Sequence, residues 1–116
     1  MGLLYYGADT TPTEIPDRLL AHVKVVIATK LRRNESFTLS WRHPESVAGG
    51  RTTLWMQPSI PLRFVFDDPE PETLDPDLLR NLVNSANSSA GVSLSWEEEP
   101  APEAAVAALR QPVAAA

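Results

Sequence analysis

The amino-acid sequence predicts an α+β domain in which a mainly antiparallel sheet carries two helices packed on one face. Three observations predict this class. Apolar residues recur at helical spacing in residues 16–33 and 75–86, whereas they alternate with polar residues in 36–42 and 51–57. Each strand then has one apolar side and each helix one apolar stripe, so both helices are expected on the same face. The expected order over residues 1–96 is β-α-β-β-β-α-β.

The first strand is expected at residues 3–6 (LLYY), and the first helix begins at Pro16. Proline suits the first helical turn because its missing N–H would have no partner there, and Asp17 places a carboxylate near the positive end of the helix. The core-facing stripe consists of Leu19, Leu20, Val23, Val26, Ile27 and Leu31.

The other side chains of this helix are expected to face water. His22 lies on the polar face, together with Arg18, and Lys24 and Lys30 lie at the margins of the apolar stripe. The lysine stems can cover the core while their ammonium groups reach solvent. Asn34 is expected to end the helix.

Residues 36–42 and 51–57 are expected to pair as antiparallel strands whose residue numbers sum to 93. One register then sorts both strands into an apolar side and a polar side, as expected when one face is buried. The pairs on the inward face are Phe37–Met56, Leu39–Leu54 and Trp41–Thr52, and the outward pairs are Arg42–Arg51, Ser40–Thr53 and Thr38–Trp55. A further strand at 62–66 turns Arg63 and Val65 outward.

The second helix is predicted by Asp75 as N-cap and Pro76 at the first helical position. Its stripe is Leu78, Leu79, Leu82, Val83 and Ala86, and a last strand follows at 92–96. Residues 97–116 are rich in glutamate, proline and alanine. They cannot bury enough apolar surface to order themselves, so we expect a disordered acidic tail.

Charge and composition restrict the function classes. Residues 1–66 carry eight basic and five acidic side chains, whereas 67–116 carry ten acidic and two basic ones. The absence of cysteine excludes disulfides and thiolate metal sites. The sequence has no signal-peptide pattern and no apolar run of membrane-spanning length, so we expect a cytoplasmic protein without a membrane association.

The run DRLLAHVKVVIATKLRRNESFTLSW, followed by GGRTTLWMQPSIPLRFVF, resembles a family of short actinobacterial proteins of unknown function. Many of them carry the label ATP-dependent DNA ligase, and the resemblance covers about residues 1–96. Such ligases attach AMP to a lysine within K-x-D-G. Here the two lysines lie in KVVI (Lys24) and KLRR (Lys30), so self-adenylation is not expected.

No motif predicts catalysis. The glycines form neither a phosphate-binding loop nor a dinucleotide fingerprint, and no serine lies in a G-x-S-x-G elbow. His22 and His43 have no second ligand at metal spacing. His43-Pro44-Glu45 is interpreted as the start of a loop. We therefore expect no enzyme activity, no metal and no cofactor.

The remaining constellation is a set of arginines around one aromatic side chain: Arg32, Arg33, Arg42, Arg51, Trp55 and Arg63. Guanidinium groups bind phosphate and aromatic faces stack on unpaired bases, so this face is the candidate site for a polyanion or nucleic acid. The alternative is a protein-interaction or homo-oligomerising module that uses the same face against an acidic partner, either the chain's own Glu97–Glu99 or another copy in a dimer. A third alternative is an accessory role in DNA ligation, which only the label of the similar proteins suggests.

Overall fold

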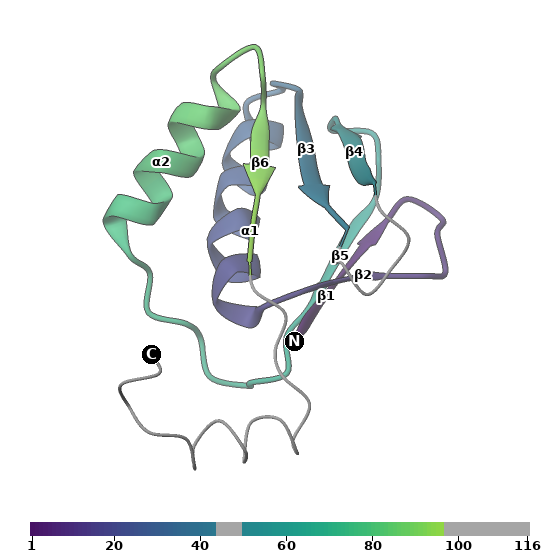
Figure 1. Cartoon of the computed structure of the whole chain (residues 1–116), viewed down its shortest axis with the longest axis vertical. Helices are drawn as coiled ribbons and strands as arrows, with labels where there is room; N and C mark the ends of the chain where they lie inside the picture. Colours follow the sequence, from purple (N-terminus) through teal and green to yellow (C-terminus); the bar gives the residue numbers. More distant parts are fainter. Residues whose placement is uncertain (44–49, 97–116) are drawn as a thin grey trace.

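The computed structural model describes residues 1–43 and 50–96, which fold into two helices and two three-stranded sheets (Figure 1). The α+β class and the predicted order of elements are confirmed, with one additional short strand between the first strand and the first helix. The elements are β1 (Gly2–Tyr6), β2 (Thr13–Ile15), α1 (Asp17–Arg32), β3 (Phe37–Arg42), β4 (Arg51–Met56), β5 (Leu62–Val65), α2 (Pro76–Ala86) and β6 (Val92–Leu94).

The strands divide between two sheets, a division that sequence analysis did not predict. One sheet has the order β2-β1-β5 and is antiparallel, and the other has the order β4-β3-β6. β5 follows β4 in the chain but pairs with β1. The two prolines between them, Pro58 and Pro61, lack the N–H that a ladder requires, which opposes a tight β4–β5 hairpin.

The register predicted for β3 and β4 is confirmed at all six pairs, from Phe37 beside Met56 to Arg42 beside Arg51. The second neighbour of β3 is β6, which runs parallel to it with Leu39 beside Val92 and Trp41 beside Leu94. A parallel neighbour requires a long crossover, and α2 supplies it.

Helix α1 ends in the manner expected from Asn34. This residue has φ 60°, in the left-handed region, and its N–H donates to the carbonyl of Leu31 at 3.0 Å. The N–H of Glu35 donates to the carbonyl of Lys30 at 3.0 Å, which completes a Schellman motif. The chain is thereby turned directly from α1 into β3.

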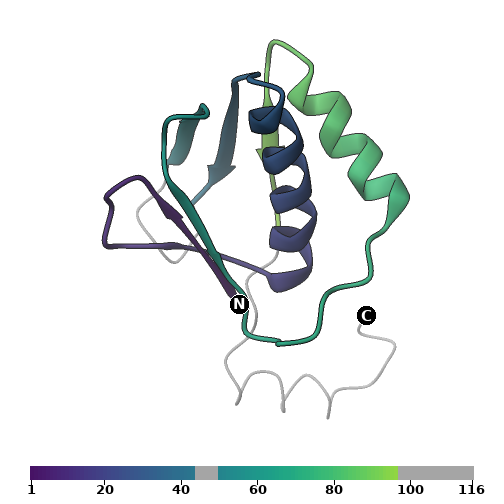
Figure 2. The same ribbon diagram turned by 180° about the vertical axis from the view of Figure 1, so that it is seen from behind.

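Helix α1 packs on one face of the β4-β3-β6 sheet, and α2 lies beside it, in contact with both α1 and β6 (Figures 1 and 2). Its apolar stripe contacts the sheet, and both sheets contribute to a single core around it. The core residues are Leu4, Ile15, Leu20, Val23, Val26, Ile27, Phe37, Leu39, Trp41, Met56, Leu82, Ala86, Val92 and Leu94.

The prediction that His22 faces solvent is wrong: its side chain is fully buried. The start of α2 covers this side of α1, and the N–H of Asp75 donates to Nε2 of His22 at 2.8 Å. The carbonyl oxygen of Arg18 can only accept, so Nδ1 donates to it, at 2.6 Å. These two partners hold the ring as the neutral Nδ1–H tautomer.

The ammonium group of Lys30 does not reach water either, contrary to the prediction. It donates to Oε2 of Glu35 at 2.9 Å and to Oδ1 of Asn87 at 2.7 Å. The hydrogen bond from Lys30 is the main cause that lowers the pKa of Glu35 below its ordinary value of 4.5, and the nearby charges of Arg33 and Lys30 add to it. Lys30 thus joins the end of α1 to the end of α2.

The second helix begins as predicted. The Asp75 side chain accepts from the N–H groups of Asp77 and Leu78, and Pro76 occupies the first turn. The tail predicted at 97–116 lies outside the described residues. No helix in residues 1–43 and 50–96 is both long enough and apolar enough to cross a membrane.

Candidate functional site

Neither of the two described helices covers the outward face of the β4-β3-β6 sheet, because both pack on the opposite side (Figures 1 and 2). We call it the open face; it comprises Thr38, Ser40 and Arg42 of β3, Arg51, Thr53 and Trp55 of β4, and Ser93 of β6. The alternation of β3 and β4 places these side chains outward whenever Phe37, Leu39 and Met56 are buried.

Arg42 and Arg51 are directly opposite each other on adjacent strands of the open face, and both are exposed. Like charges in this relation are unfavourable. Within the described part of the chain, neither guanidinium has a carboxylate at ion-pair distance. The pair therefore presents two arginine forks whose positive charge no described side chain neutralises.

Hydroxyl groups continue the open face beside the arginines. Ser40 Oγ and Thr53 Oγ1 are 2.8 Å apart and share a hydrogen bond, and Ser93 lies next to Ser40 on β6. An open hollow of about 450 Å³ lies over these residues. Its described lining is Thr38, Ser40, Trp41, Arg42, Arg51, Thr53, Ala90, Ser93 and Leu94, which includes no carboxylate.

Trp55 lies on the same face of β4 as Arg51, four residues further along the strand, and 54% of its surface is exposed. The strand rise places the two residues about 13 Å apart. The carbonyl oxygen of Trp55 accepts a hydrogen bond from the Tyr6 hydroxyl at 2.6 Å, which connects this part of β4 to β1. The exposure predicted for Trp55 is confirmed.

The other predicted arginines do not join this pair. Arg63 lies on β5, in the other sheet, where its guanidinium is stacked 4.2 Å from the centre of the Tyr5 ring. Its predicted place beside Trp55 on one sheet is wrong, since β5 pairs with β1. Arg32 and Arg33 lie at the end of α1, and Arg33 Nε is 3.1 Å from Glu35 Oε1.

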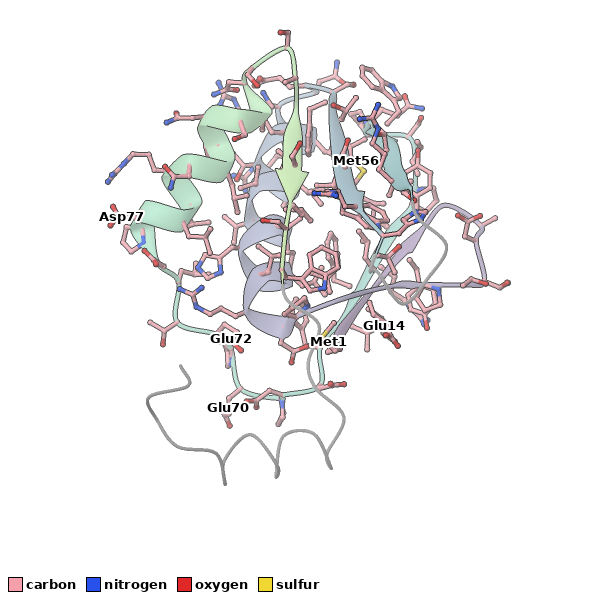
Figure 3. All side chains as sticks on the ribbon, in the orientation of Figure 1. Met1, Glu14, Met56, Glu70, Glu72 and Asp77 are labelled. Atoms are coloured by element: carbon pink, nitrogen blue, oxygen red, sulfur yellow. The ribbon has the colours of Figure 1, made fainter. Side chains whose placement is uncertain are left out.

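A second hollow, of about 330 Å³, lies between α1 and the connector of residues 67–74, and sequence analysis did not predict it. Apolar atoms of Ala21, Val25 and Phe66 form one side, and the side chains of Glu70 and Glu72 lie along the connector below α1 (Figure 3). Asp17 holds the connector there, since its Oδ2 accepts from the N–H groups of Asp67 and Asp68. The alternation of acidic residues and prolines in DDPEPE indicates an extended connector, but this pattern does not show which helix the connector packs against.

The two histidines have structural partners. His22 is buried, as described above. His43 Nε2 is 2.7 Å from Thr52 Oγ1, and the backbone N–H of His43 donates to the carbonyl oxygen of Gly50 at 2.9 Å. Glu45 lies outside the described residues. In residues 1–43 and 50–96, no group of three or more His, Asp or Glu side chains is placed to hold a metal ion.

Of three comparisons with known proteins, one found a match. No curated protein and no solved structure matches the chain. The family model described as a domain of unknown function (DUF7882) matches residues 1–97, a range that includes both helices and all strands described above. The chain therefore belongs to the DUF7882 family.

Proposed function

We propose that the open face of the β4-β3-β6 sheet binds an anionic, phosphate-bearing ligand, and that single-stranded nucleic acid is the ligand class that uses the whole face. One observation carries the proposal: Arg42 and Arg51 lie directly opposite each other on an exposed sheet surface without a carboxylate partner among the described residues. A phosphate between the two guanidinium groups would convert a repulsive pair into two charge-assisted hydrogen-bonded contacts.

The hydroxyl groups and Trp55 support a nucleic acid rather than an isolated phosphate. Ser40 and Thr53 extend the polar surface away from the arginines, and serine and threonine hydroxyls commonly bind phosphate and sugar oxygens. Trp55 lies four residues beyond Arg51 on β4, which corresponds to about 13 Å at the rise per residue of a β-strand. An unpaired base could stack on its exposed ring.

A single strand fits this surface better than a duplex. Base stacking on Trp55 requires a base free of its own stacked neighbours. Both helices of residues 1–43 and 50–96 lie on the opposite side of the sheet, so the described part of the open face presents no helix that could enter a major groove.

The test is binding of a fluorescein-labelled single DNA strand of about twelve nucleotides to the full chain, measured by fluorescence anisotropy at low salt and higher salt. The double variant Arg42→Gln/Arg51→Gln should weaken binding at least tenfold at low salt. Because the two guanidinium groups share one phosphate, their loss should reduce the slope of log affinity against log salt by about 0.7, the value per phosphate on a single strand.

A matched control removes two positive charges elsewhere. Lys24 and Arg80 are exposed on α1 and α2, and their replacement by glutamine changes the net charge by the same amount. If Lys24→Gln/Arg80→Gln weakens binding as much as the arginine-pair variant, the attraction is general and the open face is not the site. Absence of binding by the wild-type chain at low salt would overturn the proposal.

The role of Trp55 has its own comparison. Trp55→Leu should weaken single-strand binding by about 1–3 kcal/mol, whereas Trp55→Phe, which keeps an aromatic ring, should retain most of the affinity. Equal affinities for the two variants would remove Trp55 from the site.

A second candidate function is an interface with another protein or with a second copy of this chain. Tryptophan and arginine are enriched at the hot spots of protein interfaces. The 54% exposure of Trp55, on the same face as Arg42 and Arg51, therefore also favours a protein interface. Light scattering after size-exclusion chromatography at several protein concentrations tests self-association. A dimer that Trp55→Leu dissociates would support this function in place of nucleic-acid binding.

A further inference from the structure

Strand β6 ends beside the arginine pair of the open face. It runs parallel to β3, with Ser40 beside Ser93 and Trp41 beside Leu94. The two strands therefore leave the sheet at the same end, where Arg42 follows Trp41 and meets Arg51 across the β3–β4 pair. An antiparallel β6 would have delivered the following residues to the opposite end, near Trp55.

The residues that follow β6 are acidic. Glu97, Glu98 and Glu99 come three to five residues after Leu94, and Glu103 follows shortly afterwards. Leu94 lies beside Trp41, and three residues of extended chain span up to about 11 Å, so the chain after β6 is long enough for the acidic run to reach the arginine pair. The twenty residues beyond Trp96 carry four glutamates and one arginine.

We infer that Glu97–Glu99 occupies the arginine pair of the open face in the absence of ligand and competes there with an external polyanion. This inference rests on the proposed function, since it names the internal competitor of the same site. The acidic run supplies the carboxylates that Arg42 and Arg51 lack among the described residues. A short tether also gives it an effective concentration on the order of millimolar, although each contact is weak.

The competition is modest in size and sensitive to salt. Exposed ion pairs contribute little individually, so the acidic run should weaken external binding by about threefold to tenfold. Salt screens exposed charge pairs. The difference between chains with and without these glutamates should therefore shrink as the salt concentration rises.

The test compares full-length chains with the labelled single strand described above. Glu97→Gln/Glu98→Gln/Glu99→Gln should bind it about threefold to tenfold more tightly than wild type at low salt, with convergence at high salt. The matched control Glu14→Gln/Glu70→Gln/Glu72→Gln removes three carboxylates from β2 and the connector. Its affinity should rise clearly less, because these residues do not follow β6.

A readout without ligand separates the two proposals. Backbone amide resonances of Glu97–Glu99, measured by ¹⁵N NMR on the full chain, should shift in Arg42→Gln/Arg51→Gln and stay in place in Lys24→Gln/Arg80→Gln. Unchanged resonances, or equal affinity gains in the two glutamate variants, would overturn the competition while leaving the arginine-pair site intact. If no chain binds the DNA strand, the proposed function fails and the competition fails with it. Shifted resonances would then support only the contact between the acidic run and the arginines.

Discussion

Gly91, at the entrance to β6, is the position where a single added methyl group should do the most damage. Its φ is +75°, and a Cβ there would lie 2.0 Å from Thr38 Oγ1 and 2.6 Å from the Thr38 carbonyl oxygen. The hydroxyl could rotate away. The carbonyl belongs to the backbone of β3, so Gly91→Ala must push β6 away from β3.

Two costs add for this substitution. An alanine in the left-handed region costs about 1–2 kcal/mol. Forcing a methyl group into a packed contact costs a further 1–3 kcal/mol or so. The expected loss is thus about 2–5 kcal/mol, a large share of the roughly 5–15 kcal/mol by which domains are usually stable.

Urea unfolding, monitored by circular dichroism, measures this loss as a lower midpoint, with an unchanged dependence of the free energy of unfolding on urea concentration. Gly7→Ala is the matched control, because Gly7 has φ +61° but its added Cβ would meet no atom closer than 3.9 Å. Gly7→Ala should lose only the backbone part, about 1–2 kcal/mol. Equal losses for the two variants would refute the close approach of β6 to β3, and with it the geometry from which the position of the acidic run is inferred.

Three further predictions concern the contacts between α1 and α2. Lys30→Met keeps the apolar stem but leaves Glu35 and Asn87 without their shared hydrogen-bond donor. We expect it to lower the free energy of unfolding, measured by urea titration, by about 1–3 kcal/mol. An unchanged urea midpoint would mean that the buried ammonium group contributes nothing to stability. His22→Phe retains a ring of similar shape but removes both hydrogen bonds to the backbone, so it should lower the melting temperature measured by calorimetry, and a melting temperature equal to wild type would contradict the assigned partners. For Asp75, hydrogen bonds from the N–H groups of the first turn lower its pKa from 3.8, so its contribution to stability is present above pH 3.8 and is lost as the pH falls through the lower pKa of the folded state. Asp75→Asn keeps a capping oxygen that cannot titrate and should therefore make stability less dependent on pH below 3.8, as measured by urea midpoints over that range.

Local sequence patterns were sufficient where neighbouring residues decide the structure. The Asp75-Pro76 start of α2 depends on hydrogen bonds within one turn, and Asn34 adopts the left-handed conformation that its short polar side chain tolerates. The register of β3 and β4 was predictable because a shift by one residue would expose Phe37 and Leu39. The same alternation correctly placed Trp55 on the exposed side.

Patterns failed where a second element covers a polar surface. His22 has the spacing of a solvent-facing residue, and only the connector that leads into α2 brings the Asp75 N–H to its ring. Lys30 is buried for the same reason, since its ammonium group meets Asn87 from the end of α2. Polar burial depends on partners distant in the chain, and a residue's own periodicity carries no information about them.

The sequence by itself determined the α+β class, the helices, the β3–β4 register and the outward position of Arg42, Arg51 and Trp55, because each follows from local spacing and from the need to bury one side of an element. The tertiary structure alone decided that β5 joins β1, which separates Arg63 from the other arginines, and that β6 runs parallel to β3. Strand partners and directions are chosen by packing around the shared core and by the crossover through α2, and short strands of similar composition do not encode that choice locally.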